Sequence, residues 1–228
     1  GTGNDLIVGG DANDSVDDSN STPAGSDTLI GGGGNDHIVG GSYNTDTGAA
    51  VGTGGGENLI WAGAGNDTVS GDDAGDTIGG GAGNDDIDAG AGNDLIFGST
   101  GNDTINGGAN DDTLFGGEDD DMVDGGLGDD IIWAGAGDDT LTGGAGADQF
   151  IFGDMSGNDT VTDFDAGEDI LDLQYASTDF AALADVQAAS TETTQNAQSG
   201  LLIDLGDGDF VFLIGMGISD LTTGNVTI

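Results

Sequence analysis

The chain has 228 residues, of which 44 are Asp or Glu and none is Lys or Arg, so its formal net charge is −44. This charge excludes a surface that attracts nucleic acid or an anionic membrane, and it favours cations as partners. The absence of cysteine excludes disulfides and thiolate metal sites, and no apolar run approaches the roughly 20 residues of a membrane span.

Glycine dominates the rest of the composition, with 49 glycines against a single proline. Ordering so many glycines is entropically unfavourable, so an ordinary apolar core does not suffice to fold this chain. Two classes remain open, a disordered acidic chain and a fold neutralised by metal. The chain opens in mid-repeat at Gly1-Thr2-Gly3-Asn4-Asp5 without a Met, and we therefore expect it to be a piece of a longer protein.

A nine-residue repeat, G-G-x-G-x-D-x-U-x with U apolar, runs from the first residues and is uninterrupted over ten units from Ala62 to Ile151. Residues 1–61 keep the same frame with two insertions, near Asp18 to Ala24 and Ser42 to Gly54, which we expect to be loops; the second has room for a degenerate unit around Asp46. Position six is Asn58 once and otherwise Asp5, Asp14, Asp27, Asp36, Asp67, Asp76, Asp85, Asp94, Asp103, Asp112, Asp121, Asp130, Asp139 and Asp148. Position eight is apolar in every unit: Ile7, Val16, Leu29, Ile38, Ile60, Val69, Ile78, Ile87, Ile96, Ile105, Leu114, Val123, Ile132, Leu141 and Phe150.

The unit predicts one turn and one short strand. The six residues G-G-x-G-x-D tolerate positive φ and form the turn, whereas x-U-x forms a strand with its middle side chain inward. Two units then make an 18-residue coil, and coils stack in parallel about 4.8 Å apart. We therefore predict an all-β fold, a right-handed parallel β-roll, divided into residues 1–61 with the two insertions, the uninterrupted roll 62–151, and a C-terminal β-rich cap 152–228.

The stack places the position-six carboxylates in columns along its two edges. Two unit charges about 5 Å apart repel by roughly 1 kcal/mol in water and by several times that near a protein surface. Repeated over a dozen neighbours, this exceeds a typical folding free energy of about 5–15 kcal/mol, so a cation must bind the columns. Ligands that are all oxygen indicate a hard cation, and flexible glycine loops suit Ca²⁺ better than Mg²⁺. The sequence therefore predicts several bound Ca²⁺ ions whose binding is coupled to folding.

The last 77 residues predict less repetitive elements. We expect one short helix from Ser177 to Ala189, with Phe180, Leu183 and Val186 on one face. Two strands, Leu201 to Leu205 and Asp209 to Ile214, should be separated by a Gly206-Asp207-Gly208 turn.

These repeats resemble the RTX (repeats-in-toxin) family of hemolysin-type calcium-binding nonapeptides, found in the C-terminal β-roll region of type I-secreted bacterial proteins. The resemblance implies that each Ca²⁺ sits between loops of successive coils, held by position-six carboxylates and by carbonyls at positions two and four. Those carbonyls are Gly63, Gly65, Gly81, Gly83, Gly90, Gly92, Gly126, Gly128, Gly135, Gly137, Gly144 and Gly146. Asn58 at position six, and Ala74, Asn110 and Asp119 at position four, depart from the family pattern.

The tail carries the resemblance further. Residues 157–173 look like the segment that closes RTX rolls, and Ile218 to Thr222 resembles the uncleaved C-terminal signal of type I export. The resemblance implies the type I secretion apparatus as a partner and a location outside a bacterial cell or on its surface. The main expectation is a calcium-binding structural and secretion module that folds after export. The alternatives are a self-assembling surface-layer, matrix or adhesin subunit, and an accessory module of a secreted hydrolase or epimerase.

Catalysis by this chain is not expected. Its one histidine, His37, stands at position seven, which points out of the strand, and no H-E-x-x-H motif is present. The carboxylate pairs are explained by the repeat, and the twelfth residue of an EF-hand loop begun at Asp163 would be Gln174 rather than Glu. Position three lacks the regular Thr and Asn array that ice binding requires. We predict no catalytic residues and no organic cofactor.

The nine-residue repeat does not explain one further pattern, the apolar residues at positions seven and nine of alternate units. In every second unit position nine is Trp61, Gly79, Phe97, Phe115, Trp133 and Ile151, and position seven adds Leu59, Leu95 and Ile131. The interleaved units are mostly polar at both positions, so one sheet should be apolar on its outer face. Two interpretations stay open: the C-terminal segment covers this face, or the face mediates self-association through Trp61, Phe97, Phe115 and Trp133.

Overall fold

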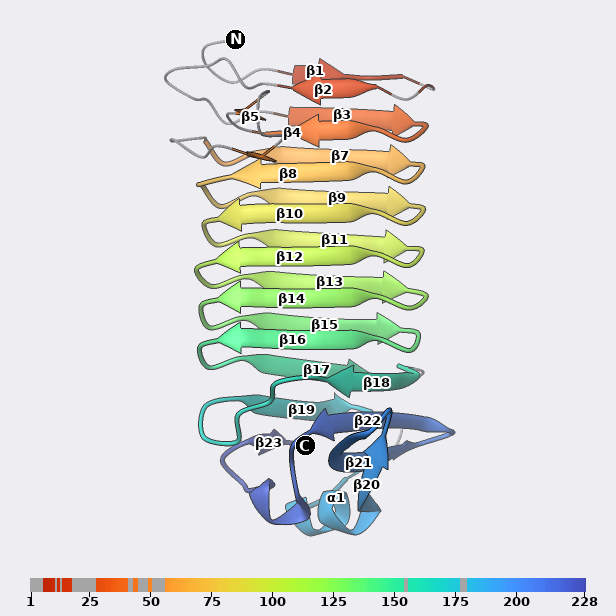
Figure 1. Cartoon of the computed structure of the whole chain (residues 1–228), viewed down its shortest axis with the longest axis vertical. Helices are drawn as coiled ribbons and strands as arrows, with labels where there is room; N and C mark the ends of the chain where they lie inside the picture. Colours follow the sequence, from red (N-terminus) through yellow and green to blue (C-terminus); the bar gives the residue numbers. More distant parts are fainter. Residues whose placement is uncertain are drawn as a thin grey trace.

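The computed structural model describes residues 6–10, 12, 14–17, 28–40, 43–44, 49–50, 56–153, 156–176 and 180–228. These residues form an elongated stack of coils that ends in a C-terminal cap (Figure 1). The predicted positions Asp5, Asp27 and Asp46, and most of both insertions, lie outside the described residues.

Two sheets run the length of the stack, and the chain alternates between them (Figure 1). The ten-stranded sheet contains, in order, β1 (Leu6–Val8), β3 (Thr28–Gly33), β7 (Leu59–Ala64), β9 (Thr77–Ala82), β11 (Leu95–Thr100), β13 (Thr113–Glu118), β15 (Ile131–Ala136), β17 (Gln149–Gly153), β19 (Ile170–Tyr175) and β23 (Val226–Thr227). The eleven-stranded sheet contains β2 (Ser15–Asp17), β4 (His37–Val39), β8 (Thr68–Asp72), β10 (Asp86–Ala91), β12 (Thr104–Ala109), β14 (Met122–Leu127), β16 (Thr140–Ala145), β18 (Asn158–Val161), β22 (Asp209–Ile214), β21 (Gln198–Gly206) and β20 (Ser190–Gln195).

The register confirms the 18-residue parallel coil. Ile60 pairs with Ile78, which pairs with Ile96 in the next coil. Across the first insertion Val16 pairs with Ile38, an offset of 22 residues, and across the second Leu29 pairs with Ile60, an offset of 31. The insertions therefore leave the stack intact. The second one carries an antiparallel pair, β5 (Tyr43–Asn44) and β6 (Ala49–Ala50).

The predicted strand length of three residues is wrong. A typical strand such as β11 has six residues and extends from position seven through position three of the next unit, which leaves only G-x-D as the turn. Positions two and three keep pairing with the neighbouring coil, as Ser99 does with Gly117. The reason is that a stacked coil offers each backbone group a partner, so even residues with positive φ join the ladder.

The core lies between the two sheets and consists mainly of the position-eight side chains, which point inward from both of them. Position-eight residues from Val16 to Phe150 are buried, and Ile7 at the N-terminal end is partly buried. The same core continues into the cap through Phe164, Val186 and Leu213.

The cap is formed by a three-stranded antiparallel arrangement of β20, β21 and β22, which extends the eleven-stranded sheet at its C-terminal end (Figure 1). Its helix, α1, covers Leu183–Ala189, shorter than the predicted Ser177 to Ala189. Residues 177–179 lie outside the described part of the chain, and Phe180 packs against the core without being helical. Strand β20 was not predicted because its sequence, STETTQ, is polar and mostly exposed.

A short 3₁₀ helix, η1 (Ile218–Asp220), precedes the C-terminus. No helix among the described residues has the length and apolarity to cross a membrane.

Candidate metal centre

The turns place the position-six residues in two columns, one along each edge of the roll. The first column contains Asp14, Asp36, Asp67, Asp85, Asp103, Asp121, Asp139 and, beyond the predicted set, Asp159. The second contains Asn58, Asp76, Asp94, Asp112, Asp130, Asp148 and, again beyond the predicted set, Asp169. All except Asp14, which is partly exposed, have exposed fractions of 5% or less.

One oxygen of each carboxylate joins two coils. The backbone N–H of Asp85 donates to Oδ1 of Asp103 at 2.8 Å, and the N–H of Asp103 donates to Oδ1 of Asp121 at the same distance. The pattern repeats along both columns. The aspartates are therefore part of the stacking as well as candidate ligands.

The other oxygen has no partner in most coils. Oδ2 is buried without a hydrogen bond in Asp36, Asp67, Asp85, Asp94, Asp103, Asp112, Asp121, Asp130, Asp139, Asp148 and Asp159. A buried, unpaired carboxylate oxygen is strongly unfavourable unless a cation compensates it. This chain has no Lys or Arg to do so, so the columns fit an exogenous cation.

The turn around Asn58 is different because it satisfies its own polar groups. The Nδ2 of Asn58 donates to Oδ2 of Asp72 at 3.2 Å and to the Gly40 carbonyl at 3.4 Å. The backbone N–H of Asp72 donates to Oδ2 of Asp76 at 3.1 Å, so Asp76 is absent from the unpaired set. This turn therefore has less need of a cation than the eleven turns with an unpaired Oδ2. The same holds at the column ends, where the Oδ2 atoms of Asp14 and Asp169 accept the backbone N–H groups of Gly10 and Asp165.

The glycines at positions two and four fit the role of carbonyl donors. All twelve glycines predicted as ligands have positive φ, from +98° at Gly144 to +147° at Gly137. Asn110 and Asp119, which depart from the family pattern, keep positive φ as well. A Cβ on Gly81 would collide with the carbonyl oxygen of Gly63, and one on Gly83 with that of Gly65. At the other edge a Cβ on Gly108 would collide with the carbonyl oxygen of Gly90, so loop carbonyls lie close against the next coil at both edges.

Side chains alone do not complete a metal site. Within the described residues, no group of three or more His, Asp or Glu side chains is arranged to hold a metal ion. A cation at these turns would need both Asp carboxylates and loop carbonyls, which is the mixed oxygen set that Ca²⁺ accepts.

Burial makes the charged form of these carboxyls unfavourable. Burial, reinforced by the charges of neighbouring aspartates, raises the pKa of Asp85 from 3.8 to about 7 and that of Asp121 to about 8. The pKa of Asp103 rises to about 6 for the same first cause, although the N–H of Asp85 opposes it. At neutral pH the metal-free fold therefore holds its columns partly protonated.

A pH dependence of the metal-free chain follows. Because the folded pKa values lie above the unfolded value of 3.8, the folded state binds more protons, and its stability falls as pH rises through about 4 to 8. In chelator we expect more β-structure at about pH 4.5 than at about pH 8 by far-ultraviolet circular dichroism. In saturating Ca²⁺ the order should reverse, because protons compete with the cation. Equal spectra at both pH values in chelator would contradict the expectation.

Asp159 and Asp169 were missed because they follow the uninterrupted block. A usable signal was present, since Gly157-Asn158-Asp159-Thr160-Val161 repeats the pentapeptide that starts at Gly65. Burial raises the pKa of Asp159 to about 9. The columns end at Asp159 and Asp169. In the next layer of the stack, β22 and β23 pair with β18 and β19 and place other residues opposite them.

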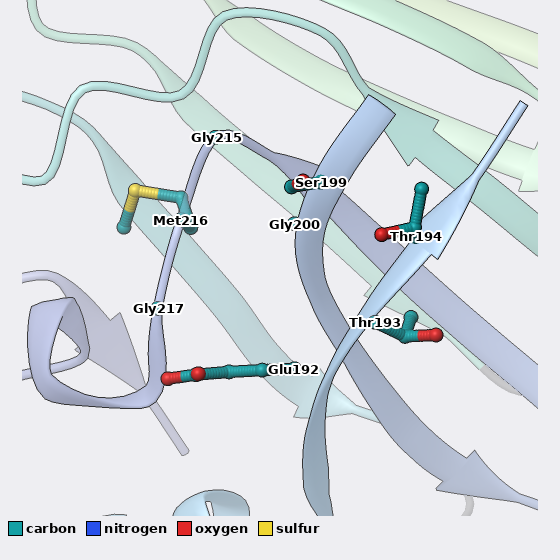
Figure 2. A pocket seen from close by; sticks show the side chains of 8 residues that line it. All are labelled: Glu192, Thr193, Thr194, Ser199, Gly200, Gly215, Met216 and Gly217. Carbon is teal, nitrogen blue, oxygen red and sulfur yellow. The ribbon is translucent and has the colours of Figure 1, made fainter. Parts of the chain in front are cut away.

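A separate groove of about 450 Å³ lies in the cap, between β20 and the segment after β22 (Figure 2). It is lined by Glu192, Thr193, Thr194, Ser199, Gly200, Gly215, Met216 and Gly217. Glu192 is the one titratable residue among them, and its Oε1 accepts the backbone N–H of Ile218 at 3.2 Å. This lining supplies no pair of acid and base groups.

A family model, the RTX calcium-binding nonapeptide repeat, matches residues 1–17, 24–42, 53–87, 88–123, 115–150 and 124–161. No curated protein sequence matches the chain at a significant level.

Two solved structures are similar in part. Extracellular lipase LipA from Serratia marcescens has 18% identity and a TM-score of 0.37, covering 90% of this chain and 45% of the lipase. The AlgE6R3 subunit from the Azotobacter vinelandii mannuronan C5-epimerase has 21% identity and a TM-score of 0.36, covering 68% of this chain and 78% of that subunit. The chain thus spans less than half of the lipase, and TM-scores this low carry no weight for function.

Proposed function

The chain belongs to the RTX calcium-binding nonapeptide repeat family, and from this premise we propose that it is a Ca²⁺-binding module that folds when Ca²⁺ binds its two edge columns. The proposed ligands are the position-six aspartates, Asp159 and Asp169 at the column ends, and the carbonyls of the position-two and position-four glycines. The bound ion neutralises the columns and completes the contacts between coils.

The main support for this proposal is the set of unpaired Oδ2 atoms in the two columns. Eleven buried Asp oxygens lack a partner, in a chain with no basic residue. Many of them lie against the first glycine of their own unit: a Cβ on Gly98, for example, would stand 2.5 Å from Oδ2 of Asp103. Glycine there leaves the oxygen room beside the turn.

The number and kind of ions test the proposal. We expect equilibrium dialysis to find on the order of ten Ca²⁺ ions per chain, because most turns contribute one unpaired oxygen. Mg²⁺ should bind more weakly and in smaller number, since it requires a tight octahedron that these turns do not offer. Fewer than about three Ca²⁺ ions, or equal binding of Mg²⁺, would refute a ligand set that repeats along the roll.

Export supplies a physiological setting for calcium-coupled folding. We propose that the chain passes unfolded through a type I secretion apparatus, using its C-terminal residues as the signal, and folds outside the cell where Ca²⁺ is abundant. It would then act as the structural and secretion module of an extracellular bacterial protein. The role of an accessory module in a secreted hydrolase or epimerase remains an alternative. Catalysis would then reside in another part of that protein.

A further inference from the structure

The outer face of the ten-stranded sheet carries a continuous row of apolar side chains, which we call the apolar ladder. It consists of the position-nine residues Val8, Ile30, Trp61, Phe97, Phe115 and Trp133 and the position-seven residues Leu6, Leu59, Leu95 and Ile131. Six of the nine large apolar side chains exposed among the described residues lie on this sheet: Leu6, Val8, Leu59, Trp61, Ile131 and Tyr175.

The ladder is closely packed along its own length. The rings of Phe97 and Phe115 stack with centroids 4.9 Å apart, and those of Phe115 and Trp133 stack at 5.9 Å. At the one gap, Gly79, the ring of Trp61 occupies the space that a side chain would take, since a Cβ there would collide with it. The aromatic row therefore continues past the missing side chain.

The C-terminal part of the chain covers only one end of this face, where the ring of Tyr175 on β19 packs against Trp133 at 5.2 Å and Ile151 is buried. Its strands β20, β21 and β22 extend the other sheet, and β23 pairs with β19 at the end of the stack (Figure 1). Trp61 is 43% exposed and Leu59 is 37% exposed, both far along the roll from the cap. The interpretation that the C-terminal segment covers the face therefore holds only at the Trp133 end, and the described tail residues leave Leu59 and Trp61 exposed.

We propose that the apolar ladder binds the same face of a second copy of this chain. Charge favours this partner. Positions seven and nine of this sheet bear no acid from β7 to β17, whereas the outer face of the other sheet carries Asp86, Asp88 and Asp124. Two copies that each carry 44 acidic residues can approach closely only where both are uncharged.

The dimensions also fit a dimer. The strands of this sheet from β1 to β17, stacked about 4.8 Å apart and each about five residues long, give a face of about 600 Å². Two such faces bury about 1,200 Å², within the range of specific interfaces. The faces of these rings are occupied by stacking on one another, so the ladder suits a flat apolar partner better than a sugar ring that needs an open aromatic face. The contact is isologous and closes as a dimer.

Sedimentation of the full chain in saturating Ca²⁺ tests the proposal. The wild type should have twice the mass of one chain, and dilution should dissociate it. Ile131→Asp places a charge in the ladder and should give the monomer. Met122→Asp is the matched control, because Met122 also stands at position seven and is 57% exposed, but on the other sheet; it should remain dimeric. If Ile131→Asp does not fold, Leu59→Asp provides the same change on β7.

Fluorescence gives an independent reading, because the chain has only two tryptophans and both, Trp61 and Trp133, lie in the ladder. Acrylamide quenching should decrease as protein concentration rises, and Ile131→Asp should abolish this protection. A wild type that is folded by circular dichroism yet monomeric would overturn the interface and leave the proposed calcium-dependent folding standing. Equal loss of the dimer in both Asp variants would overturn it too, as would tryptophan shielding that appears only with phosphatidylcholine vesicles.

Discussion

In excess chelator at about pH 8 we expect the chain to be expanded and to lack β-structure, and millimolar Ca²⁺ should convert it to the compact roll. The reason lies in the two columns. Without a cation, ionising buried carboxyls such as Asp112 and Asp139, whose pKa burial raises to about 7, opposes folding at this pH. Each further coil adds such groups, and the inward position-eight side chains provide only one buried apolar side chain for every nine residues.

Small-angle scattering and far-ultraviolet circular dichroism, recorded across a Ca²⁺ titration, measure this transition. Sodium chloride at matched ionic strength is the control, because general screening weakens repulsion between exposed charges but cannot pair a buried Oδ2. A chain that stays compact and β-rich in chelator at this pH would show that the core and backbone ladders suffice without the ion.

Much of the roll could be predicted from the sequence because the same nine-residue pattern recurs in ten consecutive units. Position eight is apolar in every unit, and the structure buries it, from Leu29 at 0% to Phe150 at 0% exposed. The 18-residue coil and the two edge columns follow from that frame. The strand length did not follow, because the prediction treated Gly-Gly as a turn, whereas stacking makes positions one to three part of the ladder.

The ends of the roll were predicted less well, since periodicity fades there. Asp159 and Asp169 belong to the columns although offsets of 20 and 21 residues replace the regular 18. The sequence of strand β20 has no alternation of apolar and polar residues that would predict a strand, and its position is set by pairing with β21. Such features depend on contacts between segments far apart in the chain. The local sequence therefore does not encode the position of β20 or the offset of Asp169, although the pentapeptide at Gly157 does point to Asp159.

The turn at Asn58 shows what a change at position six does within the fold. Its side chain still fits the column, and its backbone N–H still donates to Oδ1 of Asp76 at 2.7 Å. Asn58 lacks the negative charge of an aspartate. Its Nδ2 donates a hydrogen bond to the neighbouring carboxylate of Asp72. An Asp-to-Asn change elsewhere in a column should therefore keep the shape and remove only the charge.

Asp103 in the middle of the first column is the place to separate these roles. Asp103→Asn keeps an acceptor for the N–H of Asp85, so we expect it to raise the Ca²⁺ concentration needed for folding without breaking the hydrogen bond between the coils. Asp103→Ala removes the acceptor as well. It leaves the buried N–H of Asp85 unpaired, which lowers the stability of the folded state by about 1–3 kcal/mol. It should therefore shift the calcium midpoint further and lower the cooperativity of the transition.

The control for charge alone is Asp86→Asn, an exposed position-seven residue on β10 whose loss should change stability by no more than about 0.5 kcal/mol. Circular dichroism across a Ca²⁺ titration ranks the three variants. The largest effect is expected for Asp103→Ala, a smaller one for Asp103→Asn and the smallest for the control, if the carboxylate both joins coils and holds the ion. If the two substitutions of Asp103 behaved alike, the hydrogen bond would contribute nothing measurable. If both matched the control, Asp103 would hold no ion, and the column would be a stacking device whose unpaired oxygens are satisfied by protons instead.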